Sequence, residues 1–534
     1  MKFTITLINP NTPGDYRKAN VATVNLGIAA LSAYIKKYSN YVVNIIDARF
    51  KNLTSREVYG ELLKNPSDVL GISMCVHESS LWISSLACMV KKEFPLTHIA
   101  LGSYFPSLFP QKAFELIPKV DSIIMGEGEI TFFELISNLQ NGLEWKHIHG
   151  IAYIDSNIHK VITNEHRKLI QNLDILPFPE RYLAIGDGSN LEVEIEGARG
   201  CAFSCVFCSV RPFYGLSTGP LLRVRSAKSI LDEMLILKKK FFNLRDFRFA
   251  DPDFISASCK ERAYKFAQLL VNKSLNFRLQ IDTRAVSIKE SRTLLKLLKK
   301  AGLVSVYLGI ENGNQKILDK MNKYTTVEDN IEAANILRKL GIDYTYGFMM
   351  ITPWTSNEDI DDNITLLKQI GQIGLHNVFH EMTLIPGTPI FNSMSNVNRV
   401  IWKGNLHYFT YKTNSKRIEH LREIRKTLGE VYPEFVANFY FIYKGIRQLR
   451  WDGEDTVATK LEYENNRLIL NVFDYCWNKA GTYLPEKLKD IEVSRLCFER
   501  FSNRVNYLIE QIDPYAPIPC PANRLPPRMS VRQV

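Results

Sequence analysis

The sequence lacks any long apolar run. No segment of its 534 residues approaches the roughly 18 uninterrupted apolar residues of a membrane-spanning helix. It also lacks a disulfide framework, because its nine cysteines are an odd number and six of them stand alone. Its start is too short and too strand-like for a signal peptide. We therefore expect a cytoplasmic protein with no membrane association.

A basic nucleic-acid-binding motif is absent as well, although the formal net charge is +11. Lysine and arginine residues are spread along helical stretches such as 237–240, as they are on solvated faces. An RNA-binding or RNA-modifying protein stays open as a remote alternative, and it would bind with a steep salt dependence. The composition, 46% hydrophobic and 23% charged, is that of a globular protein. The length predicts about three domains.

Residues 1–173 predict a doubly wound, Rossmann-like domain, because strands alternate with helices. The expected strands are Phe3–Ile8, Val42–Ile46, Asp68–Ser73, His98–Gly102 and Ser122–Met125, and the expected helices are Asn25–Lys37, Leu81–Lys92 and Glu129–Leu139. A β-hairpin at 148–170 and a proline-rich connector at 174–180 follow. Ligands of such sheets bind outside the carboxyl ends of the strands. The expected binding loops are 9–13, 74–80, 102–106 and 126–129.

Residues 190–394 continue the alternation and predict a partial (β/α)6 barrel. The expected strands are Leu191–Glu196, Phe247–Ala250, Phe277–Asp282, Ser305–Ile310, Tyr344–Met350 and Asn377–Leu384. The expected helices include Ala227–Lys240, Ser287–Ala301, Val327–Leu340 and Asn357–Ile373. Chemistry in such barrels lies at the carboxyl ends of the strands.

Residues 395–534 predict a mostly helical C-terminal region, with helices at Ile418–Leu428 and Val436–Arg450. From Asp513 onward the chain carries six prolines and resembles an extended tail. This region either covers the mouth of the barrel and shapes a substrate pocket or serves as a structural cap. The sequence does not decide between the two.

Three cysteines lie within eight residues, directly after the first strand of the predicted barrel: Cys201, Cys205 and Cys208. A zinc site would need a second pair of ligands, and no Cys/His pair follows at finger-like spacing. A [4Fe–4S] cluster takes four ligands, so a loop of three thiolates leaves one iron open. The spacing therefore predicts an iron–sulfur cluster that can bind a small molecule and pass it an electron.

These cysteines, with the aromatic Phe207 before the last of them, resemble the signature of the radical S-adenosylmethionine (SAM) family over about residues 190–390. The resemblance implies that the open iron binds SAM and that reductive cleavage of SAM yields a 5′-deoxyadenosyl radical, which abstracts hydrogen from a small-molecule substrate. It also implies an external electron donor of the flavodoxin or ferredoxin type. The residues it implies around SAM or substrate are Phe207, Arg225, Asp251, Asp253, Glu311 and Tyr346.

The N-terminal domain is similar to the cobalamin-binding domain that precedes the barrel in one radical SAM class. The matching segments are 7–10, 25–27, 71–73 and 126–129, with Asp47 and Gly102. The implied cobalamin contacts are Asn9, Pro10, Asp47, Ser73, Gly102, Ser103, Gly126, Glu127 and Gly128.

Two departures from that pattern concern cobalamin. The Asp-x-His-x-x-Gly motif, which supplies a histidine ligand to cobalt in some cobalamin proteins, is absent, and no such motif surrounds His77. The lower face of cobalt is therefore unassigned. Ser103 stands where relatives often have glycine, which puts its contact with the corrin in question.

Together the two resemblances imply a cobalamin-dependent radical SAM enzyme that methylates an unactivated carbon. One SAM molecule would methylate cob(I)alamin, and a second would supply the radical that activates the substrate. Rearrangement or cyclisation with the same cofactors, without methyl transfer, is the alternative. The sequence assigns no catalytic side chain and no substrate.

Overall fold

The computed structural model describes residues 2–11, 24–183, 192–403, 408–431, 433–451, 453–482, 502–509 and 511–512. The chain divides into two compact units. The first comprises Met1–Thr283, Ser291–Leu303 and Thr383–Tyr411, and the second comprises Arg284–Glu290, Val304–Met382 and Lys412–Val534. The division runs through the predicted barrel. The three domains at 1–173, 190–394 and 395–534 therefore stay a prediction.

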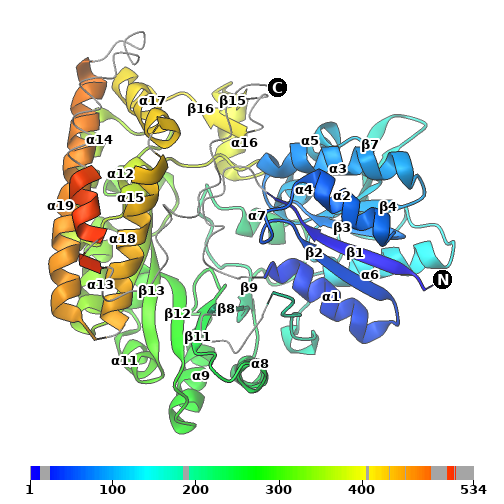
Figure 1. The fold of residues 1–534 in the computed structure, drawn as a ribbon, viewed down its shortest axis with the longest axis horizontal. Helices are drawn as coiled ribbons and strands as arrows, with labels where there is room; N and C mark the ends of the chain where they lie inside the picture. The colour runs from blue at the N-terminus through cyan, green and yellow to red at the C-terminus, as the bar shows by residue number, and fades with distance from the viewer. Residues whose placement is uncertain are drawn as a thin grey trace. The chain divides into compact units, whose positions relative to one another are not determined.

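The N-terminal sheet has the strand order β2-β1-β3-β4-β5-β6-β7 (Figure 1). Its first five strands are parallel, as expected, and the predicted hairpin adds two antiparallel strands. The strands are β1 (Thr4–Asn9), β2 (Val42–Asp47), β3 (Val69–Ser73), β4 (His98–Gly102), β5 (Ser122–Ile124), β6 (Ile151–Asp155) and β7 (Lys160–Thr163). The order reverses between β1 and β3, which is the switch point where doubly wound sheets bind ligands.

Helices cover both faces of this sheet (Figure 1). On one face, α1 (Leu26–Tyr38) and α6 (Gly128–Gln140) pack over a core that includes Ile5 and Leu7 of β1. On the other face, α2 (Ser55–Lys64), α3 (Ser80–Glu93) and α5 (Pro110–Leu116) pack over a core that includes Ile8. Successive strand residues point to opposite faces, so β1 serves both cores.

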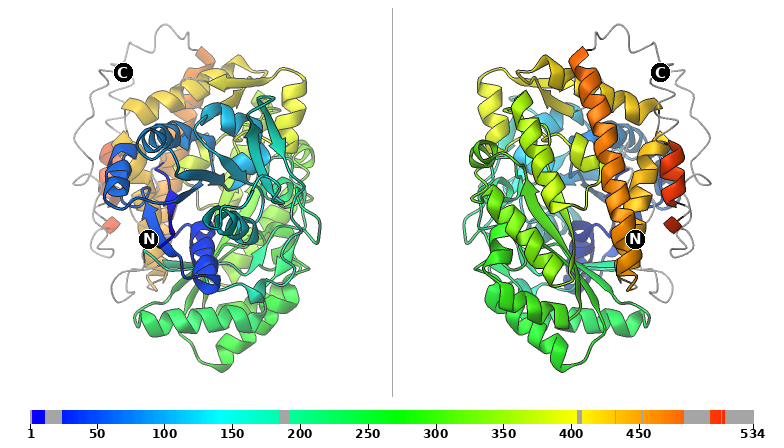
Figure 2. Two further views of the ribbon diagram at one scale, coloured as in Figure 1. Left: turned by 90° about the vertical axis from the view of Figure 1, so that its right-hand side faces the viewer. Right: turned by 90° about the vertical axis from the view of Figure 1, so that its left-hand side faces the viewer.

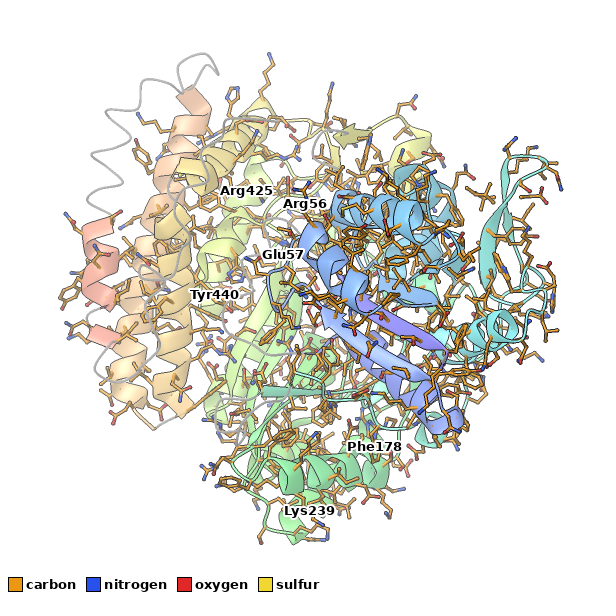
Figure 3. All side chains as sticks on the ribbon, turned by 45° about the vertical axis from the view of Figure 1, so that its right-hand side comes forward. Arg56, Glu57, Phe178, Lys239, Arg425 and Tyr440 are labelled. Atoms are coloured by element: carbon orange, nitrogen blue, oxygen red, sulfur yellow. The ribbon has the colours of Figure 1, made fainter. Side chains whose placement is uncertain are left out.

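Helix α2 was not expected from the sequence. It begins at a capping box in which the Thr54 hydroxyl accepts from the Glu57 backbone N–H and the Glu57 carboxylate accepts from the Thr54 backbone N–H. Figure 3 labels Glu57 in the first turn of this helix. The Thr-x-x-Glu spacing is a readable sign of a helix start.

The first unit also holds three parallel barrel strands and the helices next to them in the chain. The strands are β8 (Glu192–Ile195), β11 (Asp246–Phe249) and β12 (Arg278–Arg284), in the order β8-β11-β12. Leu191, the expected start of the first strand, lies outside the described residues. The helices are α7 (Val210–Tyr214), α8 (Ala227–Lys240), α9 (Lys260–Asn272) and α11 (Arg292–Lys300). A short antiparallel pair, β9 (Ala198–Arg199) and β10 (Arg223–Val224), flanks the cysteine loop.

The first unit ends with a late segment of the chain. It consists of α16 (Pro389–Asn396) and an antiparallel hairpin, β15 (Val400–Lys403) and β16 (Tyr408–Tyr411). The rings of Trp402 and Phe409 pack on His77 in the loop after β3, with centroids 6.0 and 5.3 Å away. A segment more than 300 residues downstream thus completes the N-terminal domain's surface.

The second unit contains the later barrel strands and the C-terminal helices. Strands β13 (Leu303–Glu311) and β14 (Asp343–Phe348) are parallel. The helices are α10 (Ala285–Lys289), α12 (Gln315–Lys320), α13 (Val327–Lys339), α14 (Asn357–Ile370), α15 (Leu375–Phe379), α17 (Lys416–Val431), α18 (Pro433–Trp451) and α19 (Asp455–Thr482). Helix α19 packs against α17 and α18 (Figures 1 and 2). The fold class is confirmed, including the helical C-terminal region, while the tail from Asp513 lies outside the described residues.

The last expected barrel strand, 377–384, is wrong. The chain forms the short helix α15 there, and Glu381 makes only an isolated parallel bridge with Ile351. The Asn377 side chain accepts from the Gly374 backbone N–H at 2.7 Å, which closes a helical turn. Asparagine favours such local bonds over a strand. Among the described helices, none is both long and apolar enough to cross a membrane.

Candidate functional site

A large cavity opens at the carboxyl ends of β3, β4 and β5 in the first unit. Its volume is about 300 Å³. Pockets for drug-sized ligands hold roughly 300–1,000 Å³, so this cavity lies at the lower end of that range and opens to solvent. The lining comes from the start of α1, the ends of the strands, the start of α6, and the segment from β8 to α7.

Part of the cavity lining is apolar and comes from the sheet and from the helices α1 and α6. These residues are Gly71, Ala100, Gly102, Gly128, Leu31, Ile124 and Phe132. A Cβ on Gly102 would meet no atom nearer than 3.9 Å, so the missing side chain leaves open space. A Cβ on Gly71 would lie 2.8 Å from Leu7 Cδ2 and 2.9 Å from Phe132 Cζ, so these two side chains would have to shift to admit it.

A hydrogen-bonded network joins the ends of β1, β2 and β3 to the start of α1. The Asn9 amide donates to both oxygens of Asp47 at 3.0 Å. The Asn25 amide donates to Asn9 Oδ1 and to Ser73 Oγ, both at 3.2 Å. Tyr182 donates to Asp47 Oδ2 at 2.9 Å. The network fixes the N-terminus of α1, where Asn25 is the cap.

The predicted cobalamin contacts separate into two groups. Ser73, Gly102, Ser103, Gly126, Glu127 and Gly128 line the cavity. Asn9 and Asp47 do not line it; they hold the start of α1 through the network above, and Pro10 is buried next to Asn9. Direct contact by these three stays a prediction.

Ser103 has a backbone conformation that side chains rarely adopt, with φ 89° and ψ −169°. This region is essentially reserved for glycine, and a residue held there costs of order 1–3 kcal/mol. The Ser103 hydroxyl lies 3.1 Å from Cys75 Sγ, and Cys75 also lines the cavity. Strain retained at a cavity-lining residue points to a functional position.

Arg199 joins the cavity wall to the cysteine loop through three ion pairs. Its guanidinium contacts Glu127 at 2.9 Å, Glu129 at 2.6 Å and Glu196 at 3.0 Å. Arg223 pairs with Glu127 at 2.8 Å. Arg199 and Arg223 lie opposite each other in the antiparallel strands β9 and β10. The acidic loop 126–129 is thereby tied to the strand that leads into the first cysteine.

The charges of this cluster perturb one another. Burial acts to raise the pKa of Glu129, but Arg199 beside it holds that pKa below its ordinary value. Burial raises the pKa of Glu196, and Glu129 adds to the effect while Arg199 opposes it. Burial acts to lower the pKa of Arg199, but Glu129 and Glu196 raise it well above its ordinary value. Glu196 is therefore easier to protonate than Glu129.

The cysteine loop begins at Gly200, whose φ is +84°. A Cβ at this position would lie 1.6 Å from the Leu221 carbonyl oxygen, so the loop requires glycine. Cys201, Cys205 and Cys208 are half-buried, and the Cys208 backbone N–H donates to the Cys205 carbonyl at 3.2 Å. Within the described chain, no three His, Cys, Asp or Glu side chains converge to hold a single metal ion. A cube-shaped cluster does not need such convergence, because each thiolate binds a different iron.

Helix α7 is shared by the cysteine loop and the cavity. It begins two residues after Cys208, and its Phe213 and Tyr214 line the cavity. Phe213 packs on Tyr104, with ring centroids 4.5 Å apart. Burial raises the pKa of Tyr104, and the thiols of Cys75 and Cys208 add to the effect. Tyr104, which lines the cavity, therefore lies close to the cysteine loop as well.

The predicted SAM contacts in the first unit make mostly structural bonds. Asp251 is fully buried and accepts from Gly197 and Ala198 N–H groups and from Arg262. Asp253 accepts from the Thr283 hydroxyl at 2.6 Å. Both aspartates line a small cavity of about 10 Å³ together with Cys201. Phe207 is half-buried within the cysteine loop.

Arg225, the remaining predicted SAM contact in the first unit, is also engaged internally. It pairs with buried Glu233 at 2.6 Å and donates to the Glu196 carbonyl. Its guanidinium carbon lies 5.2 Å from the ring centroid of Phe178, which Figure 3 labels. Ser226 caps the following helix by accepting from the Ser229 backbone N–H.

The two predicted SAM contacts in the second unit lie on its strands. Glu311 ends β13 at a bulge with φ 69°, and its carboxylate pairs with buried Lys323 at 2.8 Å. Tyr346 is buried in β14 and donates to the Gly371 carbonyl at 2.9 Å. The roles of both in binding SAM stay predictions.

Sequence reasoning missed Arg199, Glu196 and Tyr214 as cavity residues, whereas Tyr104 lies in the expected binding loop 102–106. A signal was present for Arg199. It stands two residues before the first cysteine, and its positive charge is opposite to that of the acidic loop 126–129. The aromatic residues carried no such signal, because Phe213 and Tyr214 belong to a helix of five residues.

Replacing Ser103 with glycine is expected to raise the free energy of unfolding by about 1 kcal/mol. Relief of the strained backbone outweighs the extra freedom of glycine in the unfolded chain. The measurement is urea denaturation of the purified protein. Ser85→Gly, an exposed position within α3, is the control and should lower stability by about 0.5 kcal/mol. Equal losses in both variants would contradict the assigned strain.

Replacing Arg199 with methionine is expected to cost about 3–5 kcal/mol of unfolding free energy, because buried carboxylates lose their partner. Arg211→Met, on an exposed arginine of α7, should change stability by less than about 0.5 kcal/mol. Thermal unfolding of both variants tests this. Similar midpoints for the two would refute a central role for Arg199.

The chain is similar to known proteins in both sequence and fold. Residues 195–367 match the radical SAM superfamily. An uncharacterized methyltransferase of Pyrococcus horikoshii is 26% identical over 79% of this chain and 89% of its own length. An anaerobic magnesium-protoporphyrin IX monomethyl ester cyclase of Rubrivivax gelatinosus is 29% identical over 59% of this chain and 56% of its own length.

Among solved structures, the cobalamin-dependent SAM radical enzyme OxsB, determined with aqua-cobalamin and SAM bound, superimposes with a TM-score of 0.70. The alignment covers 96% of this chain and 84% of OxsB at 18% identity, which establishes the fold. Residues 195–367 are thus similar to the radical SAM superfamily, and the chain has the fold of the cobalamin-dependent SAM radical enzyme OxsB.

Proposed function

We propose that the protein is a cobalamin-dependent radical SAM enzyme that methylates an unactivated carbon of a small molecule. The observation that carries the proposal is helix α7, which follows the cluster cysteines directly and forms a wall of the large cavity. Two cofactor sites are thereby built from one continuous segment. When bound, the cluster supplies an electron to SAM, and cobalamin supplies a carrier for a methyl group.

The lining of the cavity suits cobalamin. Its apolar residues suit the nucleotide arm of cobalamin. The glycines at 71, 102 and 128 let the arm approach the backbone. Ser73, Ser103 and Glu127 supply polar groups that suit the amide side chains of the corrin.

The cysteine loop fits a cluster with an open iron. Cys201, Cys205 and Cys208 offer three thiolates, and Gly200 and Asp251 fix the start of the loop through the contacts described above. Phe207, Arg225, Asp253, Glu311 and Tyr346 are the proposed surroundings of SAM, with Glu311 suited to accept hydrogen bonds from the SAM amino group or ribose.

The surrounding side chains orient the two sites and exclude water from them. Arg199 holds the acidic loop 126–129 against the strand before the cluster, and Phe213 packs on Tyr104 between the cavity and the loop. We propose a flavodoxin- or ferredoxin-type donor for the electron. We propose a cytoplasmic location, since a reducing compartment suits an oxygen-sensitive cluster.

Cyclisation or rearrangement without methyl transfer is the second candidate. It is favoured by the 29% identity to the cyclase of Rubrivivax gelatinosus, although that match spans little more than half of either chain. The methyltransferase match spans 89% of the relative's length and is the basis for preferring methylation.

The cluster is tested by Cys208→Ala. We expect loss of bound iron and loss of reductive SAM cleavage to 5′-deoxyadenosine, because two thiolates cannot hold the cluster with an open iron in place. Iron analysis and chromatography of the products are the measurements. Cys88→Ala, on exposed Cys88 in α3, should retain both properties. Undiminished cleavage by Cys208→Ala would overturn the cluster assignment.

Methyl transfer is tested with the cobalamin-loaded protein, SAM and a reductant. We expect S-adenosylhomocysteine in an amount equal to the bound cobalamin, because the methyl group of SAM passes to the cofactor before any substrate is present. Mass spectrometry measures it. Formation of 5′-deoxyadenosine without S-adenosylhomocysteine would favour the cyclisation or rearrangement alternative instead.

A further inference from the structure

The turns that follow the helices α8, α9 and α11 meet at one edge of the first unit. The Arg278 backbone N–H donates to the Arg245 carbonyl at 2.8 Å, which joins the turn after α9 to the turn after α8. The Leu279 backbone N–H donates to the Gly302 carbonyl at 2.8 Å, which adds the turn after α11. We use the name basic rim for residues 236–245, 271–276 and 296–302.

The basic rim contains many cationic residues and no aspartate or glutamate. Its exposed cations are Lys239, Lys240, Arg245, Lys273, Lys296, Lys299 and Lys300. Figure 3 labels Lys239, in the last turn of α8. The carboxylate of Asp246, just after the rim, pairs with Arg278 at 2.6 Å. The positive charge of the rim is therefore not balanced within it.

Apolar side chains are exposed among these cations. Phe242 is 67% exposed and Ile236 is 57% exposed, both close to the end of α8. Val271, in the last turn of α9, is 37% exposed. The Lys238 ammonium donates to the Leu244 carbonyl at 3.1 Å, which closes the turn that carries Phe242. The rim thus presents a phenyl ring and two aliphatic side chains to solvent from an ordered turn and two helix ends.

The helix dipole explains only part of this pattern. Lysines in the last turns of α8 and α11 interact favourably with the C-terminal ends of those helices. That interaction requires neither the exposed ring of Phe242 nor the charge of Arg245, which lies beyond the end of α8. Exposed apolar side chains interspersed with cations are typical of surfaces that lie in the headgroup region of a membrane.

The composition of the rim favours a lipid surface over nucleic acid or protein. Its exposed cations are lysines except for Arg245, whereas arginine is the preferred residue for recognising nucleic acids. Lysine is depleted in protein–protein interfaces. Clusters of lysine and arginine attract anionic lipid headgroups. Ile236 and Val271 gain nothing against the phosphates of RNA, but they lose contact with water on entering a headgroup layer.

The rim lies at the opposite end of the strands from the cysteine loop. Strands β8, β11 and β12 are parallel, and the rim precedes the start of β11 and of β12. The cysteine loop follows the carboxyl end of β8. No residue of the rim lines the large cavity. A partner bound at the rim therefore leaves the cysteine loop accessible, and an electron donor would have to bind elsewhere.

We propose that the basic rim attaches the protein to an anionic lipid surface. The lysines lie against the lipid phosphates, while Phe242 and Ile236 enter the headgroup region. Such attachment needs no spanning helix, and the expectation of no membrane association considered only the lack of a long apolar run. The inference is independent of the proposed function, because the rim belongs to neither proposed cofactor site.

The test is sedimentation of the full chain with vesicles of phosphatidylcholine and phosphatidylglycerol. We expect binding that weakens as salt rises, and no binding to vesicles of phosphatidylcholine alone. Lys239→Gln combined with Lys240→Gln should weaken binding about 30-fold, since each lysine near an anionic surface contributes roughly fivefold. The control combines Lys64→Gln with Lys92→Gln, which removes two exposed lysines from the last turns of α2 and α3 and should leave binding unchanged.

Phe242→Gln tests the apolar contribution and is expected to weaken binding about tenfold. Leu96→Gln, at a side chain that is 96% exposed outside the rim, should bind like the wild type. A wild-type protein that does not bind the anionic vesicles would overturn the proposal, as would equal losses in the two double lysine variants. Binding to an RNA oligonucleotide that depends on the rim, without binding to vesicles, would overturn it in favour of nucleic acid.

Discussion

Arg199 carries a positive charge that is buried in the wall of the cavity, and the arrangement of the site depends on it. An unpaired buried ion costs several kcal/mol, so the guanidinium requires carboxylates around it. Glu127 and Glu129 supply them from the loop after β5, and Glu196 supplies one from the end of β8. The charge therefore joins a Rossmann-like sheet to the first strand of a barrel at a fixed register.

The same residue sets the position of the cysteine loop. Only Gly200 separates Arg199 from Cys201 along the backbone, and the Leu221 carbonyl oxygen leaves no room for a side chain there. Asp251 holds the preceding turn by accepting from Gly197 and Ala198. Charge pairing on one side and backbone crowding on the other thus leave the loop little freedom. A cofactor in the cavity and a cluster on the loop are placed by shared contacts.

Much of this arrangement could be predicted from the sequence, because alternating periodicity identifies strands and their carboxyl ends. The cavity lies where β3, β4 and β5 end, as the fold class implied. The periodicity of the sequence could not show that Asn377 closes a helical turn, since this role depends on a hydrogen bond from the backbone of Gly374. It also could not show that Asp251 and Arg225 bond to protein groups, because their partners Arg262 and Glu233 are ordinary helix residues in the sequence. The strain of Ser103 likewise exists only in the folded backbone. The sequence showed only that serine stands at a position where relatives often have glycine.

The packing of Trp402 and Phe409 on His77 has a consequence for synthesis of the chain. The unit that carries the cavity and the cysteine loop includes residues up to Tyr411. Its N-terminal sheet can form early on the ribosome, but the surface around His77 stays uncovered until the β15–β16 hairpin emerges. At about 5–20 residues per second, translation of the intervening 300 or so residues takes tens of seconds. The nascent protein therefore exposes an aromatic patch during that interval, when chaperones have the opportunity to bind it.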